Sequence, residues 1–261
     1  TFVAAPNFEA PTDSGSNNVY DVTVQVADGN GGTDTQAIAV TVTNVNEAPV
    51  ITSDGAGAAA TRNAAENGTA VTTVTATDVD AATTLTYSIS GGADAAKFAI
   101  NSSTGVLTFV SAPDFEVPTD IGGNNVYDVT VQVSDGAFTD TQGIAVTVTN
   151  VNESPVITSD GGGTTASLSA AENQTAATTV ASTDVDGGAP SYSIVGGGDA
   201  ALFTINASTG VLSFVAAPNF EAPADAGGNN VYDVTVQVAD GNGGTDTQAI
   251  AVTVTSVNDN A

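Results

Sequence analysis

Apolar and polar residues alternate along several short segments of this chain. In residues 127–133 the odd positions carry Tyr or Val, whereas Asp128, Thr130 and Gln132 are polar. Successive side chains of a β-strand point to opposite faces, so this pattern predicts a strand with one buried and one solvated face. Similar runs predict strands at 71–76, 85–89, 97–100, 106–110 and 142–151, with a further short strand before Glu66.

A longer period organises these strands into repeats. The sequence NNVYDVTVQV occurs at residues 17–26, 124–133 and 229–238, which gives a period of about 105 residues, the size of a domain. Residues 1–43 and 213–255 differ at only four positions, 1, 12, 14 and 16 in the numbering of the first segment. We therefore expect the second half of a repeat at 1–48 and whole repeats at 49–153 and 154–261, as an excerpt of a longer protein.

The pattern within one repeat predicts an all-β fold. Seven antiparallel strands separated by Gly, Asn, Asp and Pro turns are typical of a Greek-key β-sandwich of the cadherin or immunoglobulin type. No segment shows a sustained helical period, so we expect almost no helix and an elongated rod of tandem sandwiches. Tyr127 and its equivalents are expected in the core or in a tyrosine corner. Asp13, Asp120 and Asp225 lie in Gly-rich loops, where we expect surface positions or a lesser ion site.

Charge and composition exclude several functions. The chain has 29 Asp and Glu against two basic residues, Arg62 and Lys97, a formal charge of −27, and no His, Cys, Met or Trp. Nucleic acid is excluded because phosphate contacts need a basic face. Thiol, imidazole and Cys/His zinc chemistry are excluded as well. No apolar run is long enough to span a membrane. Paired carboxylates alone do not make a glycosidase, which needs a concave convergent site, so we expect no enzyme activity.

The carboxylates recur at the same phase of each repeat, in turns and at repeat junctions. Five motifs carry them: Ala-Glu-Asn, Asp-Val-Asp, Phe-Glu after Pro, Asp-Gly after a Val-rich strand, and Asn-Val-Asn-Glu or Asn-Asp at the boundary. In this order, and on a β-rich period of about 105 residues, they resemble the cadherin repeat in its bacterial form, found in long surface adhesins. An isolated Asp-Gly such as that of Asp135 is by itself explained as a turn.

The resemblance implies Ca²⁺ at each junction. Near residue 48 the implied ligands are Asn7, Glu9, Asn44, Asn46, Glu47, Asp78, Asp80 and Asp135. Near residue 153 they are Glu66, Asp114, Glu116, Asn150, Asn152, Glu153, Asp184, Asp186 and Asp240. At the C-terminus Glu172, Asn219, Glu221, Asn258, Asp259 and Asn260 form half a site. The linkers depart from the family pattern, with Asn at their first position and Glu where Asp is usual, which implies weaker binding and fewer ions near residue 48.

The chemistry of the residues supports the same cation. Ca²⁺ takes six to eight hard oxygen ligands, which carboxylates, amides and carbonyls supply without His or Cys, whereas Mg²⁺ demands stricter geometry. We therefore expect a calcium-stiffened stalk or filament segment of an extracellular bacterial adhesin, with further repeats of the parent chain as neighbours. Two alternatives stay open: the repeats are themselves adhesive, toward neighbouring chains or a surface glycan, or they form a passive array on a secreted enzyme.

Overall fold

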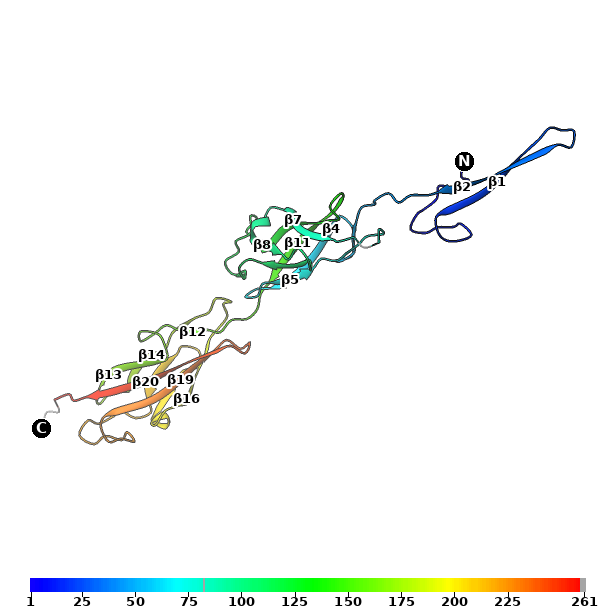
Figure 1. Ribbon diagram of the computed structural model, residues 1–261. Coiled ribbons are helices and arrows are strands. Elements are labelled where there is room, and N and C mark those ends of the chain that lie inside the picture. The colour runs from blue at the N-terminus through cyan, green and yellow to red at the C-terminus, as the bar shows by residue number, and fades with distance from the viewer. Residues whose placement is uncertain (82, 259–261) are drawn as a thin grey trace. The chain divides into compact units, whose positions relative to one another are not determined.

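The computed structural model describes residues 1–81 and 83–258, almost entirely as β-strands and turns (Figure 1). Compactness divides the chain into two units, Thr1–Asn150 and Val151–Ala261. Helix in the described residues is limited to two short 3-10 turns, η1 (Ala95–Lys97) and η2 (Ala200–Leu202). No helix among the described residues is long and apolar enough to cross a membrane. The repeat boundaries expected at 48 and 153 stay predictions.

The first unit contains a hairpin and a complete sandwich. The hairpin consists of β1 (Val19–Ala27) and β2 (Thr33–Thr41), which pair with Tyr20 opposite Val40. The sandwich contains β3 (Val50–Ile51), β4 (Ala59–Ala65), β5 (Ala70–Thr73), β6 (Ala76–Thr77), β7 (Thr86–Gly91), β8 (Phe98–Ile100), β9 (Val106–Phe109), β10 (Val126–Ser134) and β11 (Thr139–Thr149). Its sheets have the orders β4-β11-β10-β7, β5-β9-β8 and β3-β6.

The second unit repeats this sandwich. It contains β12 (Val156–Ile157), β13 (Thr165–Ala171), β14 (Ala176–Thr179), β15 (Ser182–Thr183), β16 (Ser191–Gly196), β17 (Phe203–Ile205), β18 (Val211–Phe214), β19 (Val231–Ala239) and β20 (Thr245–Thr255). The sheet orders β13-β20-β19-β16, β14-β18-β17 and β12-β15 correspond strand by strand to those of the first sandwich. The tandem β-sandwich prediction is therefore confirmed.

The alternating pattern of β10 separates core from solvent as the sequence predicts. Tyr127, Val129, Val131 and Val133 are no more than 1% exposed. They pack with β11 and the facing sheet in a core that includes Phe98 and Phe109, whose rings stack with centroids 4.7 Å apart. The hydroxyl of Tyr127 accepts a hydrogen bond from Thr119 N at 3.1 Å, as a tyrosine corner does.

Three expectations differ from the structure. Strand β4 runs parallel to β11, with Ala59 opposite Gly143, so the strands are not all antiparallel. The predicted strand 71–76 is divided between β5 and β6, because buried Val74 donates its N–H to Gly105 O where the chain changes sheets. Asp120 and Asp225 are buried rather than on the surface, since backbone N–H groups hold their carboxylates.

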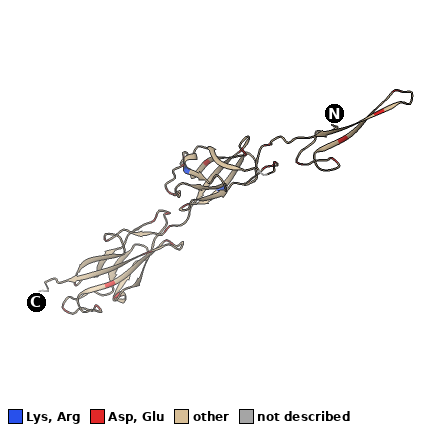
Figure 2. Ribbon diagram, in the orientation of Figure 1, with Lys and Arg blue, Asp and Glu red and all other residues tan. Residues whose placement is uncertain are grey.

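Charges are distributed unevenly over this fold (Figure 2). The two basic side chains both belong to the first complete sandwich, Arg62 in β4 and Lys97 in η1. Arg62 forms an ion pair with the buried carboxylate of Asp54. Acidic residues occur in all three repeats and concentrate in turns and connecting segments, so cations within the chain neutralise only a small part of the negative charge.

Candidate metal centre

Three carboxylates converge beside the linker that follows β2. Glu9 lies in the loop before β1, Glu47 in the linker itself and Asp80 in the turn that follows β6, and each offers an oxygen within 4.8 Å of the other two. Asp80 is buried while the two glutamates are exposed. We call Glu9, Glu47 and Asp80 the linker cluster. The cluster joins residues that are distant in the sequence, as the predicted calcium site near residue 48 requires.

Hydrogen bonds hold the linker against Asp80. The Asn44 amide Nδ2 donates to Asp80 Oδ1 at 2.7 Å, and Glu47 N donates to Asp80 Oδ2 at 2.8 Å. Next to it, Asn46 Nδ2 donates to Asp135 Oδ2 at 2.7 Å. Both asparagines therefore meet carboxylates with their N–H groups, although the amide oxygen on the same side chain is also a metal ligand type.

Hydrogen bonds within turns orient the remaining acidic side chains of this site. Asn7 Oδ1 accepts the N–H groups of Glu9 and Ala10, so the side chain of Asn7 is engaged in shaping the loop that carries Glu9. Asp78 Oδ1 similarly accepts Asp80 N at 2.9 Å. These are the local side-chain to backbone bonds that Asn and Asp form in tight turns.

The carboxyl groups of Glu47 and Asp135 differ in the direction in which their surroundings shift the pKa. Desolvation, followed by the negative charges of Glu9, Asp80 and Asp78, raises the pKa of the Glu47 carboxyl. By contrast, the Asn46 amide and the N–H groups of Phe138 and Ala137 hold the pKa of Asp135 below its usual value. Glu47 is thus a carboxylate that lacks compensating positive charge, whereas Asp135 is stabilised as an anion by its donors.

One buried oxygen beside the cluster has no hydrogen-bond partner among the described residues. Asp78 Oδ2 is inaccessible to solvent and unpaired, while Oδ1 of the same carboxylate is used by Asp80 N. Buried polar atoms without partners are uncommon because their desolvation is costly. The oxygen-only donor set and this orphaned carboxylate oxygen fit a hard divalent cation such as Ca²⁺.

Around the next linker, 150–155, the second unit forms contacts like those of the first linker, whereas the first unit forms contacts of its own. In the first unit, Glu66 Oε2 accepts Phe115 N at 2.7 Å, and Asn150 Nδ2 donates to Glu116 Oε1 at 3.1 Å. Glu66 and Glu116 offer oxygens within 4.8 Å of each other. Asp114 instead accepts Val117 N within its own turn.

In the second unit, the contacts match those around Asp80 and Asp135. Asn152 Nδ2 donates to Asp240 Oδ2 at 2.7 Å, and Glu153 N donates to Asp186 Oδ2 at 2.6 Å. Asp184 Oδ1 accepts Asp186 N at 3.1 Å. The side chain of Asn152, followed by backbone N–H groups, lowers the pKa of Asp240, as Asn46 does for Asp135.

Only part of the C-terminal half site can be placed. Glu172 is 1% exposed, and its oxygens accept Phe220 N and Val257 N at 2.9 and 2.7 Å. These donors lower its pKa. Glu221 lies in the loop between β18 and β19, where Asn219 Oδ1 accepts Ala222 N. Asn258 lies at the end of the described chain, and Asp259 and Asn260 lie outside the described residues.

Sequence reasoning missed a second class of recurring acids. Asp94 is 4% exposed and accepts the N–H groups of Ile121 and Asp128 at 2.8 and 2.9 Å. Asp199 does the same for Ala226 and Asp233. Their recurrence at the period of the repeat was the available signal. Their partners are backbone N–H groups, so these residues hold a loop in place and are not part of a carboxylate cluster.

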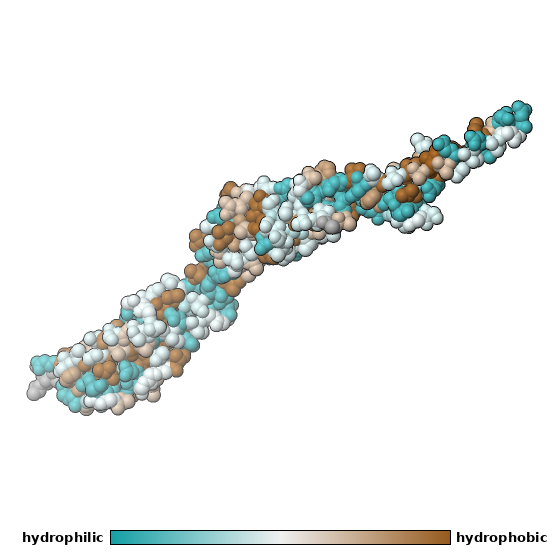
Figure 3. Space-filling view, in the orientation of Figure 1, coloured by the Kyte–Doolittle hydropathy of each residue, from teal (hydrophilic) through white to brown (hydrophobic). Residues whose placement is uncertain are grey.

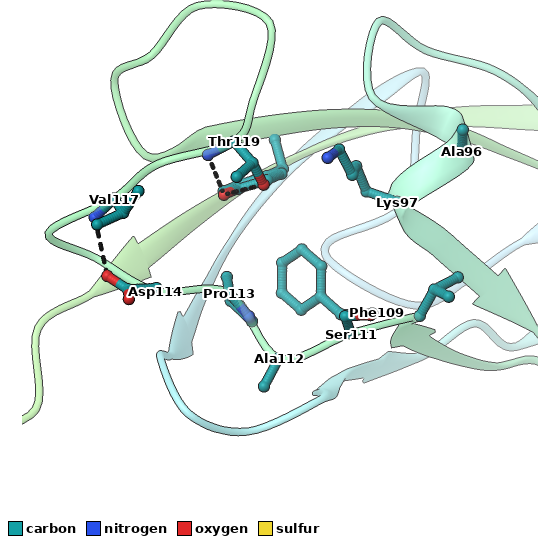
Figure 4. A pocket seen from close by; sticks show the side chains of 11 residues that line it. Ala96, Lys97, Phe109, Ser111, Ala112, Pro113, Asp114, Val117 and Thr119 are labelled. Carbon is teal, nitrogen blue, oxygen red and sulfur yellow. Dashed lines mark hydrogen bonds between the residues drawn. The ribbon is translucent and has the colours of Figure 1, made fainter.

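A cavity of about 400 Å³ lies on the first complete sandwich, beside Lys97 and Asp114 (Figure 4). Two hydrogen bonds of the fold lie along it, since Val117 N donates to Asp114 and Thr119 N donates to the Tyr127 hydroxyl.

Comparison with known proteins agrees with this geometry. Residues 58–152 match the family model "Cadherin domain", and residues 152–253 match "Bacterial Ig domain". Protocadherin Fat 1 of Homo sapiens is 28% identical over 96% of this chain and 5% of its own length. Protocadherin Fat 4 of Homo sapiens is 36% identical over 59% of this chain and 3% of its length. The chain thus spans a small fraction of these relatives.

Solved structures show the same fold. Extracellular cadherin domains 3–6 of protocadherin gamma B2 align with 94% of this chain and 61% of theirs, at 21% identity and a TM-score of 0.50. Human protocadherin-24 EC1-2 aligns with 81% of this chain and 100% of its own, at 21% identity and a TM-score of 0.53. Cadherins are extracellular adhesion proteins and not enzymes. The chain is built from cadherin-like repeat domains.

Proposed function

We propose that this chain is a structural stalk or filament segment of an extracellular bacterial adhesin, made rigid by Ca²⁺ bound at the linkers between its repeats. The linker cluster carries the proposal, because it gathers the oxygens of Glu9, Glu47 and Asp80 within 4.8 Å without a basic residue among them. Cadherin domains bind Ca²⁺ as a family, and the acidic linkers of this chain have the ligand types for it.

At the first linker the cation would be held by the carboxylates of the linker cluster together with Asp78 and Asp135. Asn7, Asn44 and Asn46 would supply neutral oxygens. When bound, Ca²⁺ supplies a divalent charge that offsets part of the negative charge of these groups. The carboxylates come from the half repeat, the linker and the following sandwich, so a shared ligand set would restrict motion between them.

We extend the proposal to linker 150–155 by sequence equivalence. Glu66, Asp114, Glu116 and Asn150 would act from the first unit, with Asn152, Glu153, Asp184, Asp186 and Asp240 from the second. Glu172, Glu221, Asn258 and Asp259 would form the next half site. The hydrogen bonds that Asp186 and Asp240 form within the second unit match those of Asp80 and Asp135, which supports the equivalence.

Calcium titration of the intact chain tests the proposal. Isothermal titration would measure the affinity for Ca²⁺, and thermal unfolding would measure how far bound Ca²⁺ stabilises the folded state. A single site is expected to stabilise the folded state by about 3–4 kcal/mol at 100–1,000 times its dissociation constant. The double variant Asp78→Asn/Asp80→Asn should lose binding at the first linker. Asp233→Asn, which removes an exposed charge on β19, is the control and should bind as the wild type does.

Rigidity needs a separate measurement. The chain has no Cys, so Thr23→Cys and Ser88→Cys, both at exposed strand positions, can be spin-labelled without background. We expect the distribution of distances between the labels to narrow in Ca²⁺, and to stay broad in the Asp78→Asn/Asp80→Asn background. Binding without narrowing would show that Ca²⁺ is a ligand of this chain but does not stiffen it. An unchanged chain in Ca²⁺ by every readout would refute the proposal.

A second candidate is that the repeats are themselves adhesive, through contacts with identical repeats or with a glycan. It is favoured by one solved relative, the protocadherin gamma B7 EC3-6 structure, which is described as a cis-dimer, is 24% identical and has a TM-score of 0.52. Sedimentation over a concentration series in Ca²⁺ distinguishes the two. A chain that stays monomeric would contradict contacts between identical repeats, and an array of immobilised glycans would test the glycan alternative.

A further inference from the structure

The cavity beside Lys97 combines an apolar lining with a single positive charge. Buried Phe109 and Tyr127 line it together with Val110 and Val117, which are both 63% exposed. Figure 3 shows brown, apolar atoms on the surface of this first complete sandwich. The cavity volume of about 400 Å³ lies within the range of about 300–1,000 Å³ that is typical of small-molecule pockets. Its size and lining therefore suit a small molecule with an apolar part.

The backbone of Lys97 is held in place beside this cavity. Its N–H donates to Asp94 O and its carbonyl accepts Val110 N, both at 2.8 Å. The side chain extends from η1 toward Thr119 across the view of the cavity (Figure 4). Because the backbone at Lys97 is fixed before a ligand arrives, less conformational freedom is lost when the ammonium group binds one.

The ammonium group of Lys97 has no anionic partner among the residues that the structure describes. Arg62, the other basic side chain, is paired with Asp54, and this is the one ion pair of the described residues. Asp114 also lines the cavity but forms no ion pair with Lys97. An ammonium group carries three N–H donors, so Lys97 can offer them to an anion that enters the cavity.

The second unit carries the same loop with different residues at the cavity. Segments 109–127 and 214–232 are of equal length and differ at positions 111, 114, 117, 119 and 121 of the first segment. All of these except 121 line the cavity. The donors at the cavity have apolar equivalents in the second unit: Lys97, Ser111 and Thr119 correspond to Leu202, Ala216 and Ala224. The sandwich therefore does not need these donors in order to fold, which favours a role for them in binding.

Charge selects the kind of ligand. Lys97 repels a cation, and a neutral apolar molecule would cover the ammonium group without pairing it, which is costly. The exposed carboxylate of Asp114 acts against a ligand with several negative charges. Carboxylates of the chain that lie beyond a Debye length, about 8 Å at physiological ionic strength, are largely screened. A ligand with one negative charge and an apolar body meets all of these conditions.

We propose that this cavity binds a small organic carboxylate. The apolar part of the ligand lies against Phe109 and Val110, and its carboxylate accepts hydrogen bonds from the ammonium group of Lys97. Ser111 and Thr119 line the same cavity as further donors. The site belongs to the first complete sandwich and rests neither on Ca²⁺ nor on the proposed stalk function.

Fluorine NMR of a small probe tests the proposal with the intact chain. The probe is 4-fluorophenylacetate, and 4-fluorophenylacetamide is the control because it has the same shape without the charge. Titrations in Ca²⁺-free buffer keep the result separate from the linkers. We expect saturable binding of the carboxylate, about tenfold tighter than that of the amide, since a charge-assisted hydrogen bond is stronger than a neutral one. Added salt should weaken binding of the carboxylate more than that of the amide.

Matched variants locate the charge that matters. Lys97→Leu introduces the residue that the second unit carries as Leu202, and should lower the affinity for the carboxylate about tenfold, to that of the amide. Lys97→Arg keeps the charge and should retain binding. Arg62→Leu, which also introduces the residue of the second unit, Leu168, removes a positive charge outside the cavity and should leave the affinity unchanged. Thermal unfolding without probe checks that each variant is folded.

Three outcomes would overturn the proposal. Absence of saturable binding of 4-fluorophenylacetate at millimolar concentrations would show that the cavity is not a carboxylate site. Equal affinities for the carboxylate and the amide would show that Lys97 does not pair with the ligand. Equal losses in Lys97→Leu and Arg62→Leu would assign the effect to the net charge of the chain. Each of these results would leave the proposed calcium-stiffened stalk untouched, because no Ca²⁺ is present in the titrations.

Discussion

The tyrosine corner offers a quantitative test of how burial sets the energy of one hydrogen bond, because three copies of it occur in different surroundings. The Tyr127 hydroxyl accepts Thr119 N at 3.1 Å, and the Tyr232 hydroxyl accepts Ala224 N at 3.1 Å. Both tyrosines are 1% exposed. In the uncovered hairpin, Tyr20 forms the same bond with an exposed partner at 3.2 Å.

Replacing Tyr127 by Phe keeps the ring and removes the acceptor. A net hydrogen bond is worth about 0.5–1.5 kcal/mol, and an unsatisfied buried donor costs about 1–3 kcal/mol. Thr119 is itself an exposed residue while the hydroxyl is buried, so we expect a loss of about 1–2 kcal/mol between these limits. This loss corresponds to a change of about 5–30-fold in the folded-to-unfolded ratio.

Hydrogen exchange measured by mass spectrometry in the intact chain can assign this loss to a repeat. Tyr127→Phe should accelerate exchange of the slowest amides in β10 and β11 by about 5–30-fold, and leave β19 and β20 unchanged. Tyr232→Phe should give the reverse. Tyr20→Phe should change stability by less than about 0.5 kcal/mol, because water can replace the bond. Equal effects at all three tyrosines would refute the argument that burial decides the energy.

Three further predictions concern the first complete sandwich. Leu107→Ala should cost about 2–5 kcal/mol in thermal or urea unfolding, because Leu107 is fully buried. Gly105→Ala should destabilise more than Gly136→Ala, since the Gly105 Cβ would collide with the backbone oxygen of Val74 whereas the Gly136 Cβ would meet no atom within 4 Å. Equal effects of the two substitutions would contradict this prediction. Desolvation acts to raise the pKa of Asp120, but backbone N–H groups outweigh it and lower that pKa. Its contribution should therefore be present above the unfolded pKa of about 4 and disappear as pH falls through the lower folded value; an Asp120→Asn chain with the same acid-unfolding profile as the wild type would contradict it.

The strands could be predicted because the information that specifies them is local. The alternation of β10 identifies its buried side chains from the sequence alone, and the corner at Tyr127 follows from its position near the start of that strand. The direction in which neighbouring strands pair could not be predicted in this way. Strand β4 contacts β11 in parallel, but a half-buried strand has the same two-residue alternation whichever way its neighbour runs.

The sequence pattern also did not predict which polar residues are buried. A Gly-rich loop with Asp and Asn indicates a solvated turn, yet Asp120 is 7% exposed. Its oxygens accept Asn124 N and Asn125 N at 3.0 Å, so the carboxylate replaces water as the acceptor for the loop backbone. This requires the loop to fold back on the aspartate, a three-dimensional condition that composition does not express.

The candidate site shows the same limit. Recurrence at a fixed phase identified the carboxylates of the linker, and Glu9, Glu47 and Asp80 do lie together. Recurrence does not reveal which atom of Asn44 faces Asp80, and in the structure it is the N–H group. The path of the linker across the end of the next sandwich decides which groups donate to the same carboxylate. The sequence pattern does not predict this path.

These contacts divide the acidity of the chain into two kinds of carboxylate with opposite responses to protons. Backbone donors lower the pKa of Asp120, so protonation of that group removes stability from the fold. Desolvation and the charges of Glu9, Asp80 and Asp78 raise the pKa of Glu47, so protonation of Glu47 relieves repulsion at the linker. A divalent cation can compete with protons at Glu47, whose carboxylate lies among other negative charges, whereas the buried carboxylate of Asp120 is held by backbone N–H groups. Mild acid should therefore displace Ca²⁺ from the linker before it unfolds the sandwiches, which separates the proposed stiffening of the chain from the stability of its repeats.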